Sequence, residues 1–68
     1  MALSNDQIEY LNFLGRTASI DSLVDLKKGN IKGIKDFDTK KIDPALIAEH
    51  AEMKEILKRW INKRQRQQ

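Results

Sequence analysis

The residues best suited to direct chemistry are cations that gather around the single tryptophan at the carboxyl end of the chain. Lysine and arginine side chains bind phosphate groups, and an exposed indole ring can stack on a nucleobase. The same cations can instead complement the dipole at a helix C-terminus and keep the protein dissolved. Both interpretations stay open, a nucleic-acid-binding surface or a solvated helix end. The cations concerned are Lys58, Arg59, Lys63, Arg64 and Arg66.

Apolar side chains in the same stretch offer a different chemistry, the docking of another protein. Leu46, His50, Met53, Leu57 and Trp60 recur at alternating steps of four and three residues. This spacing places them in one stripe along a helix. We expect part of the stripe to remain available after the other helices have packed on it, as an anchor for a protein partner or a second copy of the chain. The predicted partner-binding residues are Met53, Ile56, Leu57, Trp60 and Ile61.

The remaining residues do not support catalysis or the binding of a metal or cofactor. His50 is the only histidine and the chain has no cysteine, so a transition-metal site lacks its usual ligands. The glycines of segment 29–33 are not followed by the Gly-Lys-Ser/Thr ending of a phosphate-binding loop. The aspartates of segment 36–43 lack the spacing and the closing glutamate of a calcium loop. We therefore predict that the protein is not an enzyme and has no metal, no cofactor and no small-molecule substrate.

A chain of 68 residues makes one domain at most, and it buries only about 60% of the surface that its unfolded form exposes. Proteins this short often gain stability from a disulfide, a metal or a partner subunit. No disulfide can form here, so association is the remaining route. The net charge of +3 is uneven, because residues 44–68 hold six cations against three acids. The basic character therefore belongs to the carboxyl end.

The composition is typical of a folded domain, with 34% charged and 40% hydrophobic residues. No apolar run comes near the roughly 18 residues that a membrane span requires. The amino end lacks the basic region and apolar core of a signal peptide. We therefore expect a cytoplasmic protein that does not associate with membranes.

The elements that must position these residues are three predicted helices. The first spans residues 5–14, because Ser4 begins a capping box and Gly15 offers a stop. The second spans residues 20–28, with Ser19 as its cap and a glycine after its last turn. The short connection between them predicts that these two helices pack as a pair.

The third helix is predicted to run without interruption over residues 44–64, after an Asp43 cap. His50 would lie half-buried on its stripe, where a change of charge near neutral pH could make association pH-sensitive. Residues 29–42 are predicted to form a structured loop, although a helical turn also fits their apolar spacing. Residues 65–68 should fray as a polar tail. The prediction is an all-α fold, a small three-helix domain over residues 1–64.

A weak internal repeat relates the two halves of the chain at an offset of 34 residues, which pairs Leu26 with Trp60. Residues 43–57 resemble a degenerate ankyrin repeat, in which Pro44 opens the first helix. Residues 30–38 would then be the extended finger between two repeats. The chain departs from the family pattern, since Asp stands where the family usually has Thr before the proline. The resemblance to an ankyrin-repeat pair implies protein–protein recognition without catalysis.

Two functions follow as hypotheses. The first is a small non-catalytic protein–protein interaction module, a regulator or assembly factor that docks its apolar stripe on a partner or on its own copy. The alternative is a nucleic-acid-binding regulator that uses the basic helix end, and its binding would weaken steeply with salt. The small size is also typical of accessory proteins of phages and mobile elements.

Overall fold

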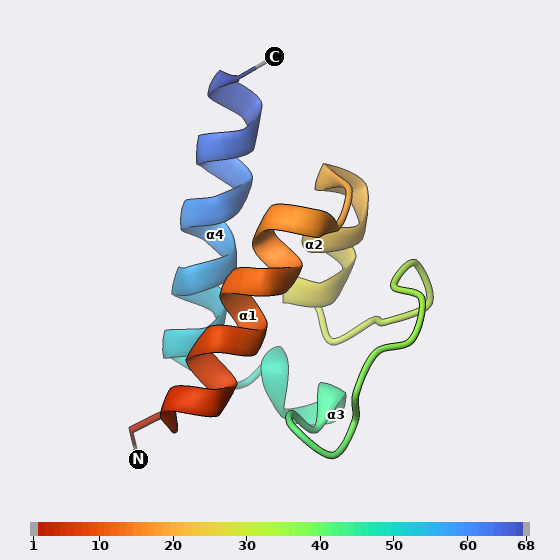
Figure 1. Cartoon of the computed structure of the whole chain (residues 1–68), viewed down its shortest axis with the longest axis vertical. Coiled ribbons are helices and arrows are strands. Elements are labelled where there is room, and N and C mark those ends of the chain that lie inside the picture. Colours follow the sequence, from red (N-terminus) through yellow and green to blue (C-terminus); the bar gives the residue numbers. More distant parts are fainter. Residues whose placement is uncertain (1, 68) are drawn as a thin grey trace.

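The computed structural model describes residues 2–67, and this part of the chain forms four helices and no strand. Figure 1 shows α1 (Asn5–Thr17) beside α4 (Ala51–Arg66), with both helices running in the same direction. Between them in the sequence, α2 (Ile20–Lys27) runs back and a single turn, α3 (Pro44–Ile47), lies near the start of α4. The all-α fold predicted from the sequence is confirmed.

The first helix begins as predicted and ends later than predicted. Ser4 and Gln7 form the complete capping box, in which each side chain accepts a hydrogen bond from the other residue's backbone N–H. The helix then passes through Gly15 and ends at Thr17, where the N–H of Ala18 donates to the Leu14 carbonyl. The predicted end at residue 14 is therefore wrong, because Gly15 does not terminate the helix.

The glycine serves a close approach of two helices instead. Gly15 is buried, and a Cβ atom built on it would lie 2.3 Å from Cγ of Trp60 on α4. No side chain larger than a hydrogen atom fits between the α1 backbone and this indole ring without a shift of the ring. The α1 backbone can approach α4 this closely because position 15 is a glycine.

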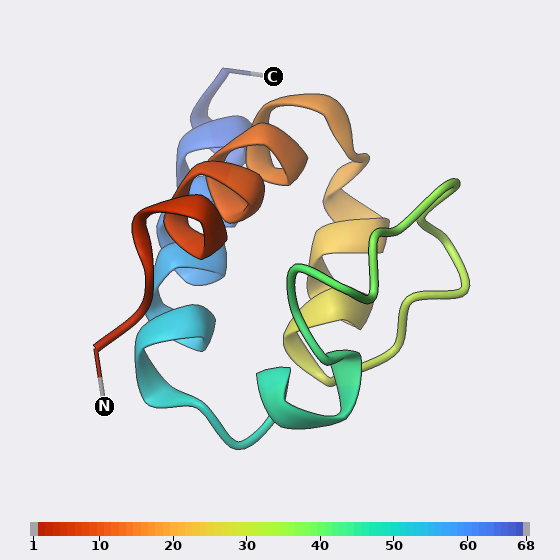
Figure 2. The same ribbon diagram turned by 60° about the horizontal axis from the view of Figure 1, so that its bottom comes forward.

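The second helix and the loop after it follow the prediction. Ser19 caps α2 by accepting a hydrogen bond from the Ser22 N–H, and Gly29 ends it with a positive φ of 86°. Residues 28–43 then form a turn-rich loop without a helix. Figure 2 shows this loop on the far side of the molecule from α4. The Ser22 hydroxyl donates to the Gly33 carbonyl at 3.0 Å, and the Asp38 N–H donates to the Tyr10 hydroxyl oxygen at 2.7 Å.

The predicted continuous helix over residues 44–64 is divided in two, which corrects the sequence analysis. The short α3 is closed by two backbone hydrogen bonds, each of which spans three residues. The Glu49 N–H donates to the Leu46 carbonyl, and the His50 N–H donates to the Ile47 carbonyl. His50 then adopts an extended conformation (φ −95°, ψ 108°) and stands at the N-cap of α4. The break also takes Leu46 out of the predicted stripe, since its side chain is 52% exposed. Ile47 joins the core in its place, beside the apolar residues of α4.

The core is a single cluster that draws on every helix and on the loop. Each of its large apolar side chains contributes about 1.5–3 kcal/mol by leaving water. The buried members are Leu11, Leu14, Leu23, Leu26, Ile42, Ile47, Met53, Leu57 and Ile61. The last helix continues to Arg66, two residues beyond its predicted end, and Gln67 is its C-cap. The final residue of the predicted frayed tail, Gln68, lies outside the described residues.

Candidate functional site

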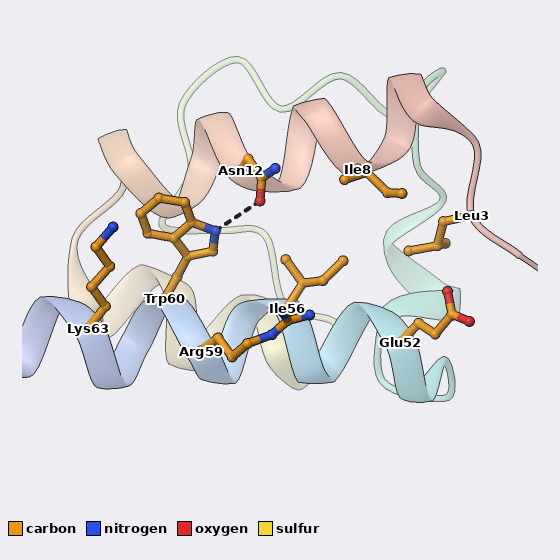
Figure 3. A pocket seen from close by; sticks show the side chains of 8 residues that line it. All are labelled: Leu3, Ile8, Asn12, Glu52, Ile56, Arg59, Trp60 and Lys63. Atoms are coloured by element: carbon orange, nitrogen blue, oxygen red, sulfur yellow. Dashed lines mark hydrogen bonds between the residues drawn. The ribbon is translucent and has the colours of Figure 1, made fainter.

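A groove of about 500 Å³ runs along the seam between α1 and α4. Figure 3 shows it with α1 as one wall and α4 as the other, while α2 and the loop lie behind. Three lining residues come from α1 and the segment before it, and five come from α4. They are Leu3, Ile8 and Asn12 on the first wall and Glu52, Ile56, Arg59, Trp60 and Lys63 on the second.

The centre of the groove is apolar and partly open to solvent. Ile8 from α1 and Ile56 from α4 point toward each other across it, and Leu3 lies at the end where both helices begin (Figure 3). All three side chains are half-buried. Leu3 and Ile56 pack against the core on one side, and the three side chains together leave an apolar strip for another molecule on the other.

Trp60 is held rigidly at the opposite end of the groove. Its indole Nε1–H donates to Oδ1 of Asn12 at 3.0 Å, as the dashed line in Figure 3 marks. The ring also lies against Gly15, and Nζ of Lys63 sits 4.9 Å from the ring centroid, within range of a cation–π interaction. Contacts on three sides therefore fix the orientation of the largest aromatic side chain of the chain.

The charged residues of the groove are separated along its length. Glu52 lies beside Leu3, at the end where α1 and α4 begin. Lys63 lies at the end that holds Trp60, and the Arg59 side chain points from there along α4 toward Ile56 (Figure 3). All three charged side chains are exposed. The groove thus has an acidic end and a basic end, with Ile8, Ile56 and the Arg59 side chain between them.

The structure divides the predicted partner-binding residues into two groups. Met53, Leu57 and Ile61 are 3%, 0% and 7% exposed, because α1 and α2 cover this side of α4. Their side chains belong to the core and are out of reach of a partner. Ile56 and Trp60 line the groove and remain accessible. The accessible apolar surface is therefore one flank of the predicted stripe.

The five predicted nucleic-acid-binding cations also fall into two groups. Arg64 is half-buried, and its Nη1 donates to the carbonyl oxygens of Gly15 and Ala18 at the end of α1. These carbonyls lack partners within their own helix, so the guanidinium group acts as a cap supplied by another helix. The other four side chains are exposed on α4, and they are Lys58, Arg59, Lys63 and Arg66.

Sequence reasoning missed the groove residues Leu3, Ile8, Asn12 and Glu52 as members of one site. Leu3 and Ile8 fit the apolar pair that brackets a helix start, so their role appeared to be local. The four-residue step from Ile8 to Asn12 does place both on one face of α1. That spacing is the only indication in the sequence that Ile8 and Asn12 belong to one surface. It does not identify the helix that lies opposite them.

The remaining sequence candidate, His50, is half-buried at the start of α4. Its side chain makes no capping hydrogen bond, and its Nδ1 atom is buried without a partner. In the part of the chain that the structure describes, no three His, Cys, Asp or Glu side chains could together hold a metal ion. His50 therefore stands alone, and its surroundings identify it as a helix boundary.

A second cluster of aromatic side chains lies on the side of α1 that faces the loop. The Tyr10 ring stacks against Phe13 with centroids 6.4 Å apart and meets the edge of Phe37 at 5.5 Å. Phe13 is 49% exposed. The Tyr10 hydroxyl and the Phe37 ring both hold the loop, which gives these two residues of the cluster a structural role.

No helix within residues 2–67 is long and apolar enough to cross a membrane. Comparison with protein-family models, with curated proteins and with solved structures finds no match to this chain. The resemblance to an ankyrin-repeat pair stays a prediction. The groove and the exposed cations of α4 are the features that bear on function.

Proposed function

We propose that this chain is a small non-catalytic interaction module and that the α1–α4 groove is its docking site for another protein. The observation that carries the proposal is an accessible apolar strip, Ile8 and Ile56, that ends in a fixed tryptophan and is bordered by charges. Tryptophan and arginine are enriched among the residues that dominate binding energies at protein interfaces. The groove holds one of each.

The rigidity of Trp60 favours binding. A side chain that is already oriented loses little conformational entropy when a partner covers it, and about 0.5–1.5 kcal/mol is saved for each such side chain. Asn12 and Gly15 supply this orientation in the free protein. The module would act as a regulator or assembly factor by occupying a surface of its partner.

Affinity capture with matched variants tests the proposal. Circular dichroism first verifies the helical content of the wild type, of the groove variants Ile56→Asp and Leu3→Asp, and of the control Lys58→Gln. Each protein is then immobilised. We expect a partner protein to be retained by the wild type and by the control, and not to be retained by either groove variant. The proposal fails if every protein retained by the wild type is retained equally by Ile56→Asp and Leu3→Asp.

The exposed cations of α4 favour a second candidate function, nucleic-acid binding. Arg59, Lys63 and Arg66 are spaced by four and three residues, so they form a basic row on one face of the helix. Titration of single-stranded and double-stranded nucleic acid at several salt concentrations tests it. Binding that weakens steeply with salt, and is lost when Lys58, Arg59, Lys63 and Arg66 become glutamine together, would support this candidate. Arg64 must be retained, because it holds the end of α1.

A further inference from the structure

We propose that the groove binds a second copy of this chain, and that the two α4 helices pack antiparallel across a two-fold axis near Ile56. This inference rests on the proposed function, because it assumes that the groove is the docking surface. The partner is then the same chain, and the charges at the two ends of the groove set the orientation.

The side chains at the two ends of the groove differ in charge, with Glu52 at one end and Lys63 at the other. Both helices begin at the end that holds Glu52, and both run toward the end that holds Trp60 and Lys63 (Figure 3). The backbone dipoles of the two walls add in the same sense and place their positive ends beside Glu52, where they offset part of its charge. A molecule that complements the side chains of this groove must present a cation near Glu52 and an anion near Lys63.

A second copy meets this requirement in one orientation only. If the two grooves faced each other in parallel, Glu52 would face the partner's Glu52 and Lys63 would face the partner's Lys63. Two like-charged contacts would then oppose association. In the antiparallel orientation each Glu52 meets the partner's Lys63, and the helix dipoles also oppose each other favourably. A single isologous patch thereby forms both ion pairs.

The spacing along α4 places apolar side chains between these two ion pairs. Glu52 and Lys63 are eleven residues apart, which is about 16 Å along the helix. Ile56 lies between them, with Ile8 opposite on α1. The midpoint between Glu52 and Lys63 falls between Ile56 and Arg59. Antiparallel pairing therefore puts Ile8 and Ile56 of both copies near the axis, with the exposed Arg59 beside them, and the Glu52–Lys63 pairs at the rim. Apolar anchors enclosed by a polar rim are the usual arrangement of a stable interface.

The size of the chain adds a reason for self-association. A domain of 68 residues without cysteine has a small core, and proteins of this size often gain stability from a partner subunit. Burial of the apolar strip in a dimer would enlarge the core without any change in the fold. The basic carboxyl ends of the two α4 helices would point in opposite directions, which limits their mutual repulsion.

Charge reversal with light scattering tests both the partner and the orientation. Solution mass is measured from micromolar to millimolar protein for the wild type, Glu52→Lys, Lys63→Glu and the double variant. We expect a wild-type dimer, dimers weakened about tenfold or more by either single reversal, and restored dimerisation in the double variant. The matched controls Glu55→Lys and Lys58→Glu lie on the exposed face of α4, do not line the groove and should leave the dimer unchanged.

A zero-length carbodiimide cross-linker gives an independent result with the unmodified chain. Glu52 and Lys63 of one copy are too far apart for such a link, so a Glu52–Lys63 isopeptide found by mass spectrometry must join two copies. We expect this link in the dimer band. Links that join Lys63 to other carboxyl groups, without any to Glu52, would overturn the proposed pairing.

Different failures separate this inference from the proposed function. A monomer at every concentration overturns the second-copy proposal, while the capture experiment with Ile56→Asp still tests the groove. A dimer that Ile56→Asp leaves intact also overturns the second-copy proposal, because its interface then lies outside the groove. The proposed function fails only if the capture experiment fails as well. A dimer weakened by the single reversals but not restored in the double variant overturns the antiparallel orientation.

Discussion

The indole ring of Trp60 on α4 lies against the backbone of Gly15 on α1, at a position that has no side chain. The same ring donates its N–H to Asn12, one turn earlier on α1. Trp60 thus contributes both to the stability of the α1–α4 pair and to the groove between the two helices. A substitution at Gly15 should therefore change both the stability of the protein and the shape of the groove.

Replacement of Gly15 by alanine should destabilise the protein, although alanine is the better helix former by about 1 kcal/mol. The added Cβ must displace Trp60, and overpacking of this kind costs about 1–3 kcal/mol. Urea denaturation followed by circular dichroism measures the effect. In a Trp60→Leu background the clash is relieved, so Gly15→Ala should there become neutral or stabilising. An equal loss of stability in both backgrounds would exclude the ring as the cause.

Arg64 and Arg66 form a matched pair that separates a structural cation from a surface cation. Arg64→Gln removes the hydrogen bonds to the Gly15 and Ala18 carbonyls and should lower the free energy of unfolding by about 1–2 kcal/mol. Arg66→Gln makes the same change of charge on an exposed residue of the same helix and should change stability by less than about 0.5 kcal/mol. Thermal or urea denaturation of both variants checks this difference. Equal effects would show that net charge matters and the α1 cap does not.

Local sequence signals predicted the starts of α1, α2 and α3. Ser4, Ser19 and Asp43 accept the capping hydrogen bonds that their residue types predict, and Gly29 takes the left-handed conformation that ends α2. These features depend on residues within one turn of each other, so a single sequence contains the information. The all-α fold follows from them.

Features that depend on contacts between two helices were not predictable from such local signals. Gly15 and Arg64 have ordinary local interpretations as a helix stop and a solvated cation, and only the approach of α4 to α1 gives them their roles. The groove requires the same knowledge, since it joins Ile8 to Ile56. The break at His50 was missed because the apolar spacing fits one helix as well as two.

Replacement of His50 by asparagine should stabilise the protein. Asparagine is a preferred N-cap residue and can accept the backbone N–H bond that His50 does not, which is worth about 0.5–2 kcal/mol. The change also removes the buried Nδ1 atom that lacks a partner. A continuous helix through residue 50 predicts little change in stability, since histidine and asparagine have similar helix propensities. The midpoint of thermal unfolding therefore tests the division between α3 and α4.

Tyr10→Phe should loosen the loop without altering the helices. The variant keeps the ring contact with Phe37 but loses the hydroxyl that accepts the Asp38 N–H, at a cost of about 1 kcal/mol. Amide hydrogen exchange should become faster at Asp38 and its neighbours, with α1 and α4 unchanged. Unaltered exchange at Asp38 would show that the hydrogen bond does not hold the loop.

The central claim is that this protein acts through the α1–α4 groove, and amide NMR spectroscopy tests it most directly. Spectra of the isotope-labelled chain are recorded while the same chain, unlabelled, is added. The single indole N–H of Trp60 provides an isolated signal inside the groove. We predict concentration-dependent shifts for Trp60, Ile56 and Ile8, with signals of the loop around Asp38 unchanged. Shifts confined to the exposed face of α4 or to the loop, with the Trp60 signal fixed, would contradict the account.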